Sequence, residues 1–170
     1  MEIVLRPFEK EDIETYREWI NNPEIGELID RNLPVSKYEH EIWYHKLIQN
    51  RDAVVFAIET IDEHKYIGNV WLWDINWRHH KAEVRIVIGD SDYQGIGLGT
   101  DALKLITECA FTELNLNKIY AYVLCYNQRA KKSFEKAGFK IEGILKQERF
   151  INGEYHDVLI VAMYRSDYDQ

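Results

Sequence analysis

The stretch DYQGIGLGTDALKLI, residues 92–106, has three glycines within five positions, directly before a run of helix-forming residues. Apolar side chains recur from this run onward at the spacing of one helix face, which predicts a helix over about residues 98–114. The alternating residues 81–89 precede the glycines and predict a strand. A glycine turn between a strand and a helix can bind an anion, because the first helical amides lack a partner within the helix.

Three phosphate-binding motifs contain such a turn, and the sequence distinguishes between them. The P-loop needs a lysine after its last glycine, but Thr100 directly follows Gly99. The dinucleotide motif G-x-G-x-x-G would need a glycine at Thr100 and an acid at the end of the next strand, where Leu124-Cys125 stands. The pattern Q/R-x-x-G-x-G/A is matched in full by residues 94–99. A tight turn without a ligand does not need three alternating glycines, so a phosphate site is expected.

The rest of the chain predicts an α/β (α+β) fold with a mixed, mostly antiparallel sheet. Pro23 and Pro34 predict a loop over residues 22–34, and Asn152-Gly153 predicts the turn of the last hairpin. A right-handed crossover helix should join the strands 81–89 and 118–125. Strands are expected at residues 3–8, 53–60, 65–73, 81–89, 118–125, 140–151 and 155–164, and four helices at 10–21, 37–50, 98–114 and 128–137.

Length and composition favour a single globular domain over residues 1–170, large enough to bury a core. The net charge of −8 argues against a nucleic-acid partner bound through phosphates. No apolar run is long enough to span a membrane, so no membrane partner is expected. Cys109 and Cys125 lack metal or redox spacing and are expected to be reduced, in a cytoplasmic protein without a metal.

Two further motifs accompany the glycine turn. Asn127-Gln128-Arg129-Ala130 is followed by FEKAGF at residues 134–139, and residues 150–157 are FINGEYHD. With the glycine turn, they resemble the GNAT N-acetyltransferases over nearly the whole chain. The resemblance is to the branch that contains the ribosomal-protein N-terminal and the spermidine/polyamine acetyltransferases. It implies one GNAT domain, whose sheet splays between strands 81–89 and 118–125, and direct acetyl transfer from acetyl-CoA to a primary amine in a ternary complex.

The resemblance also implies which residues bind acetyl-CoA. The backbone of residues 86–88 would pair with the pantetheine arm, and the amides of residues 95–100 would hold the pyrophosphate. Asn127 would contact the arm from the other side. Lys131 would lie near the nucleotide, unless it only faces solvent. The expected coenzyme-binding residues are Ile86, Val87, Ile88, Gln94, Gly95, Ile96, Gly97, Leu98, Gly99, Thr100, Asn127, Ala130, Lys131 and Phe134.

Acetyl transfer to an amine requires a base for the ammonium and can use an acid for the leaving thiolate. Glu83 is the candidate base, because family members with an Ala-Glu pair here use the glutamate; an ion pair with Arg85 is the alternative. Many relatives have a tyrosine acid at the position of Phe134, and phenylalanine cannot donate a proton. Tyr126 and Ser133 are the remaining candidate acids, although Tyr126 could instead be an aromatic wall.

Acidic residues before the second long helix suggest part of the acceptor site. Polyamine enzymes of the branch carry paired acids there, and this chain has Asp30-Arg31-Asn32. Arg31 would repel a polyamine, whereas Glu27 and Asp30 could each bind an ammonium group. All three residues, Glu27, Asp30 and Arg31, are expected to bind the acceptor.

Trp71 and Trp73 are expected to wall the acceptor site, with Trp77, His79 and His80 nearby, although ordinary strand packing is the alternative. The acceptor stays open: a ribosomal-protein or other protein N-terminus, a small amine or polyamine, or a free or nucleotide-linked amino sugar. A non-catalytic acyl-CoA-binding module is the competing class. A homo-oligomer is a further possibility for this branch.

Overall fold

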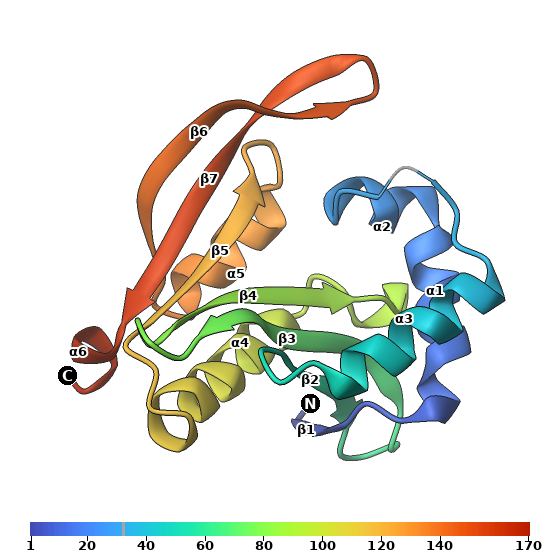
Figure 1. The fold of residues 1–170 in the computed structure, drawn as a ribbon, viewed down its shortest axis with the longest axis horizontal. Coiled ribbons are helices and arrows are strands. Elements are labelled where there is room, and N and C mark those ends of the chain that lie inside the picture. The colour runs from blue at the N-terminus through green and yellow to red at the C-terminus, as the bar shows by residue number, and fades with distance from the viewer. Residues whose placement is uncertain (32) are drawn as a thin grey trace.

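The computed structural model describes residues 1–31 and 33–170, so the loop prediction at Asn32 lies outside the described residues. The chain forms one seven-stranded sheet in the order β1-β2-β3-β4-β5-β7-β6 (Figure 1). The strands are β1 Ile3–Pro7, β2 Val54–Thr60, β3 Tyr66–Asn76, β4 Lys81–Ile88, β5 Lys118–Leu124, β6 Lys140–Ile151 and β7 Glu154–Tyr164. The helices are α1 Ile13–Asn21, α2 Pro23–Leu28, α3 Lys37–Gln49, α4 Leu98–Glu108, α5 Gln128–Lys136 and α6 Arg165–Tyr168. The predicted single-domain α+β fold with a mixed, mostly antiparallel sheet is confirmed.

Helices cover the sheet on two faces and create two apolar cores (Figure 1). On one face, α4 and α5 bury side chains such as Leu103 and Phe134 against the sheet. On the other, α1 and α3 pack Tyr16 and Leu47 against Trp71 of β3. Strand β4 contributes to both cores, with Ala82 and Val84 in the first and Val87 in the second.

The predicted splay of the sheet lies between β4 and β5. These two strands pair in parallel only over residues 81–83 and 118–120, although β4 continues to Ile88 and β5 to Leu124 (Figure 1). On its other edge, β5 pairs with β7 along its whole length. The facing backbone edges of residues 84–88 and 121–124 are therefore not paired with each other, and we call this break in the pairing the opening; its backbone groups can hydrogen-bond to an extended ligand.

The expected loop over residues 22–34 is wrong in its first half, where α2 forms at Pro23–Leu28. Asn22 caps this helix, because its side-chain oxygen accepts a hydrogen bond of 3.0 Å from the backbone N–H of Glu24. Pro23 is then the first helical residue, a position that needs no N–H donor. Proline therefore starts a helix here.

Other boundaries differ because of local irregularities. Strand β3 continues to Asn76 through a bulge in which Asp74 has a left-handed φ of 51°. The predicted helix over residues 98–114 is α-helical to Glu108 and then forms a π-helical turn at Cys109–Glu113. The short helices α2 and α6 raise the expected four helices to six among the described residues. The hairpin turn is confirmed, with φ of 50° at Asn152 and 84° at Gly153.

Candidate active site

The glycine turn joins the end of β4 to α4 and leaves open space in front of the helix. Gly95 and Gly97 have left-handed φ values of 73° and 93°, which favour glycine at both positions. Gly99 does not have such a φ, and a Cβ placed on it would lie 3.8 Å from Ser133 Oγ, an ordinary contact. Neither backbone conformation nor packing explains the glycine at position 99. A ligand that approaches the first turn of α4 explains why residue 99 is small, so the site fits the pyrophosphate of a coenzyme.

The side chain of Gln94 ties the glycine turn to β4 and α5. Its Nε2 donates a 2.8 Å hydrogen bond to the Ile88 carbonyl, and its Oε1 accepts a 3.1 Å bond from Arg129 Nη1. The Arg129 guanidinium lies 3.9 Å from the Cβ position of Gly95. Arg129 therefore places a positive charge beside the turn.

Arg129 was not among the predicted coenzyme residues, whereas Lys131 was. Both are on α5, with Arg129 exposed and Lys131 half-buried. A basic run at the start of a helix does not reveal which of its residues faces another segment. The sequence therefore carried no signal that Arg129 lies beside the glycine turn. Asn127, also predicted, caps α5 by accepting a 3.1 Å bond from the N–H of Ala130.

The remaining predicted coenzyme residues lie at the edge of the opening or beneath the turn. Ile86, Val87 and Ile88 pair with β3 through one backbone edge, and their other edge faces the opening. Leu98 and Thr100 are buried, so their amides, not their side chains, are available to a ligand, whereas Ile96 is exposed.

Glu83 occupies the last parallel pair before the strands separate. It lies opposite Tyr120 on β5 and Trp73 on β3. Its carboxylate accepts hydrogen bonds from Arg85, whose guanidinium stacks 4.9 Å above the centre of the Trp73 ring. The ion pair with Arg85 is thus present, and the carboxylate stands at the closed end of the opening.

Tyr120 is a polar neighbour of Glu83 that the sequence analysis did not identify. Burial raises its pKa, and the negative charge of Glu83 adds to this effect. Its hydroxyl is therefore protonated at neutral pH. The parallel pairing of β4 with β5 creates this neighbourhood, and spacing along the chain does not reveal it.

The three residues expected near the thiol lie in different surroundings. Phe134 is buried, with its ring edge-on to Phe139 at 5.0 Å. Ser133 faces the glycine turn at Gly99. Tyr126 follows the end of β5, and its hydroxyl donates a 3.1 Å bond to Glu27 Oε1. Burial, together with this bond to Glu27, raises the pKa of Tyr126.

Two of the expected acceptor residues contact segments on the β5–β6 side of the molecule. Glu27, in α2, accepts a hydrogen bond from the hydroxyl of Tyr126, which follows the end of β5. Asp30, just after α2, lies 3.4 Å from Arg149 Nε on β6. The expected residue Arg31 acts elsewhere: burial, followed by the positive charge of Arg31, lowers the pKa of His40 to about 4. His40 belongs to α3, so the charge of Arg31 reaches the aromatic cluster under that helix.

The expected tryptophan cluster is divided between core and surface. Trp71 is 5% exposed and packs against Tyr16, so it belongs to the core. Trp73 is half-buried beneath Arg85, beside Glu83. Trp77 instead donates a 3.0 Å hydrogen bond to Asp52, in the turn before β2. Of the three tryptophans, Trp73 is the one placed beside the candidate base.

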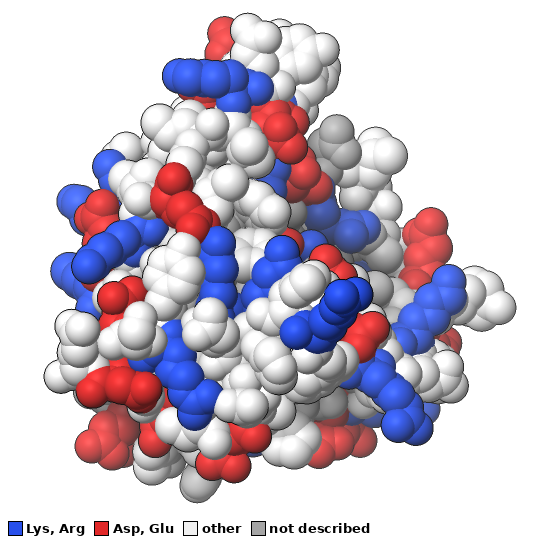
Figure 2. Space-filling model, turned by 60° about the vertical axis from the view of Figure 1, so that its left-hand side comes forward, with Lys and Arg blue, Asp and Glu red and all other residues white. Residues whose placement is uncertain are grey.

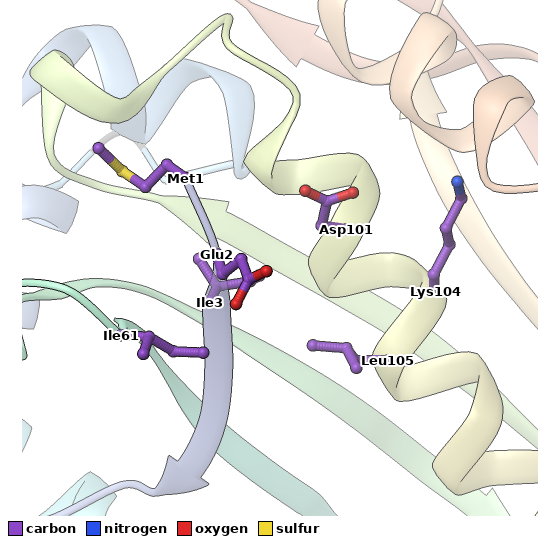
Figure 3. A pocket seen from close by; sticks show the side chains of 7 residues that line it. All are labelled: Met1, Glu2, Ile3, Ile61, Asp101, Lys104 and Leu105. Atoms are coloured by element: carbon purple, nitrogen blue, oxygen red, sulfur yellow. The ribbon is translucent and has the colours of Figure 1, made fainter.

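A separate hollow of about 330 Å³ lies between β1 and α4, with Glu2 and Ile3 on one side and Asp101, Lys104 and Leu105 on the other (Figure 3). Because β1 is the outer strand of the sheet, this hollow is remote from the opening between β4 and β5.

The described residues were compared for surface charge, groups of metal ligands and helix hydropathy. On the face in Figure 2, Lys and Arg side chains are interspersed with Asp and Glu side chains. No group of three or more potential metal ligands occurs among residues 1–31 and 33–170. In the same part of the chain, no helix has the length and apolar character needed to cross a membrane.

Known proteins share both the sequence pattern and the fold. A family described as Acetyltransferase (GNAT) domain matches residues 2–140. The spermidine N(1)-acetyltransferase of Escherichia coli (strain K12) is 33% identical over 174 residues, covering 98% of this chain and 88% of the relative. The crystal structure of spermidine N-acetyltransferase from Vibrio cholerae in complex with CoA and spermine has a TM-score of 0.93 at 33% identity, covering 99% of this chain and 98% of that one.

A dodecameric structure of the Vibrio cholerae enzyme in an intermediate state matches with a TM-score of 0.82 at 30% identity, covering 98% of this chain and 95% of that one. The similarity therefore extends over the complete sheet and both helical layers. The chain belongs to the GNAT acetyltransferase family and is an acetyl-CoA-dependent N-acetyltransferase.

Proposed function

We propose that this enzyme transfers the acetyl group of acetyl-CoA to a primary amine of a polyamine. The observation that carries the proposal is the placement of Glu27 and Asp30, which reach from α2 to β5 and β6 across the opening. A polyamine has several ammonium groups, so one can react near Glu83 while another is held by these carboxylates. The similarity to spermidine acetyltransferases supports this acceptor over a protein N-terminus.

Coenzyme binding is assigned to backbone groups and one arginine. The amides of residues 95–100 hold the pyrophosphate, and Arg129 adds a positive charge beside them. The free edge of residues 86–88 pairs with the pantetheine arm, as a strand would. Acetyl-CoA supplies a thioester carbonyl that the acceptor amine can attack.

Glu83 is proposed to accept the proton that the acceptor ammonium must lose, either directly or through water. The ion pair with Arg85 orients its carboxylate. Of the two candidate acids we favour Tyr126, because Ser133 faces the glycine turn. Tyr126 retains its proton at neutral pH because burial and Glu27 raise its pKa, so it can donate to the leaving thiolate.

Self-association of the chain is part of the proposal. The C-terminal hairpin projects from the sheet and exposes Ile144, Phe150 and Tyr155 (Figure 1). Exposed apolar patches of this kind mark contact surfaces, and the dodecameric relative supports an assembly of several chains. Light scattering on the purified protein tests this, and a monomer at micromolar concentration would contradict it.

A panel of amines tests the acceptor. The purified protein and acetyl-CoA are mixed with spermidine, spermine, propylamine, a peptide with a free N-terminus or glucosamine, and release of the CoA thiol is followed. The proposal expects the highest kcat/KM for spermidine or spermine. A higher value for the peptide or for glucosamine would contradict the polyamine assignment, and no release with any amine would favour a non-catalytic binding module.

A further inference from the structure

Arg149 forms an ion pair with Asp30, one of the two acids proposed to bind the acceptor. Asp30 Oδ2 lies 3.4 Å from Arg149 Nε, and the Arg149 side chain is 22% exposed while that of Asp30 is 53% exposed. Glu27, by contrast, meets the uncharged hydroxyl of Tyr126. One acid at the opening is thus neutralised by the protein's own cation, and the other is not.

A bulge in β6 directs Arg149 toward α2. The pairing of β6 with β7 shifts between Leu145 and Arg149, and Gln147 has a left-handed φ of 51°. Asp157 stabilises the bulge by accepting a 2.9 Å bond from the Gln147 N–H. Arg149 resumes the pairing opposite His156, whose ring packs edge-on to Tyr126 at 4.9 Å. Arg149 is therefore fixed by the strand pairing beside the contact that joins α2 to β5.

We infer that Arg149 is a specificity-determining residue of the acceptor site. Its guanidinium neutralises Asp30 in the free enzyme, and an acceptor with a second positive charge must displace it. A solvent-accessible ion pair at this distance is weak, so the exchange is feasible, but it lowers the affinity for multiply charged amines. An amine with a single charge does not need Asp30 and is not affected. The inference rests on the proposed polyamine acceptor.

The experiment compares the KM for spermidine and for propylamine in four forms of the full-length protein. Arg149→Gln should lower the KM for spermidine about threefold or more, because Asp30 no longer has a competing cation. The KM for propylamine and for acetyl-CoA should not change. Arg149→Lys keeps the charge and should behave as the unaltered protein. Lys140→Gln makes the same change in net charge at the far, exposed end of β6 and should have little effect.

A substitution of Asp30 tests whether Arg149 acts by neutralising that carboxylate. Asp30→Asn should raise the KM for spermidine, and adding Arg149→Gln to it should give no further gain. An unchanged or higher KM for spermidine in Arg149→Gln, with a normal melting temperature, would overturn the inference. So would an equal gain in Lys140→Gln.

The failure of this inference differs from the failure of the polyamine assignment. If the unaltered protein acetylates spermidine but Arg149→Gln shows no gain, only the inference fails. If the unaltered protein acetylates no polyamine, calorimetric titration with spermine decides the inference: tighter binding by Arg149→Gln supports it, and equal, weaker or absent binding overturns it.

Discussion

Replacing Gly99 with aspartate should separate the stability of the fold from coenzyme binding. A Cβ at position 99 would lie 3.8 Å from Ser133 Oγ and 3.9 Å from Ile88 Cγ1, both ordinary contacts. A carboxylate in the first turn of α4 interacts favourably with the helix dipole, by about 0.3–1 kcal/mol. Loss of a helical glycine removes a further cost of up to about 1 kcal/mol. The free energy of unfolding should therefore be unchanged or higher in Gly99→Asp.

The same substitution should weaken the binding of CoA. The new carboxylate would stand where the pyrophosphate binds, and two like charges about 4 Å apart repel by about 4 kcal/mol at the effective dielectric constant of a protein surface. Salt and side-chain movement reduce this repulsion. Even about 2.7 kcal/mol corresponds to a Kd for CoA that is about 100-fold higher.

Isothermal titration with CoA and urea unfolding measure the two effects on the same samples. Gly99→Ala is the matched control, because it adds the Cβ without the charge, and the motif accepts alanine at this position. It should bind CoA nearly as well as the unaltered protein. Unimpaired binding of CoA by a folded Gly99→Asp protein would refute the assignment of the glycine turn to the pyrophosphate.

Four other changes test the remaining parts of the account. Glu83→Gln should lower kcat at least about 100-fold at neutral pH, with recovery at higher pH as the free amine becomes abundant; a flat pH–rate profile with unchanged kcat would remove Glu83 as the base. Tyr126→Phe should lower kcat at least about tenfold without changing the KM for acetyl-CoA, and equal kcat would leave Tyr126 as a wall of the site. Because burial lowers the pKa of His40 from 6.5 to about 4, the contribution of His40 to the unfolding free energy should be constant above about pH 6.5 and fall by up to about 3 kcal/mol as the pH drops to 4. His40→Phe should flatten this dependence in urea titrations, and equal slopes would contradict it. Gly89→Ala should lower the melting temperature, with a cost of about 1–3 kcal/mol, since its Cβ would come 1.9 Å from the Trp19 ring; an unchanged melting temperature would show that the ring moves freely.

Features decided by neighbouring residues were predictable from the sequence. Ser36 and Glu39 match the S-x-x-E capping pattern and form a capping box, with hydrogen bonds of 3.2 and 2.8 Å between each side chain and the other's backbone N–H. The glycine turn and the Asn152-Gly153 hairpin depend likewise on left-handed φ values that few residues adopt. Such local chemistry determined most element positions, whereas the splay beside the turn was expected from the resemblance to the GNAT family.

Features decided by contacts between distant segments were not predictable. Pro23 was interpreted as a helix breaker, although the cap at Asn22 makes it the first residue of α2. The contact of Arg149 with Asp30 depends on a bulge in β6 and on the position of α2, neither of which has a sequence signal. The core position of Trp71 depends on α1 packing over β3. Sequence patterns identify residue types suited to a site, and tertiary packing decides which of them reach it.

Identification of the product tests the central claim most directly. The purified protein is incubated with acetyl-CoA and spermidine, and the product is analysed by mass spectrometry with parallel measurement of free CoA. The account predicts spermidine carrying one acetyl group, in an amount equal to the CoA released. Release of CoA without an acetylated amine, or no reaction with spermidine at concentrations that saturate its relatives, would contradict it.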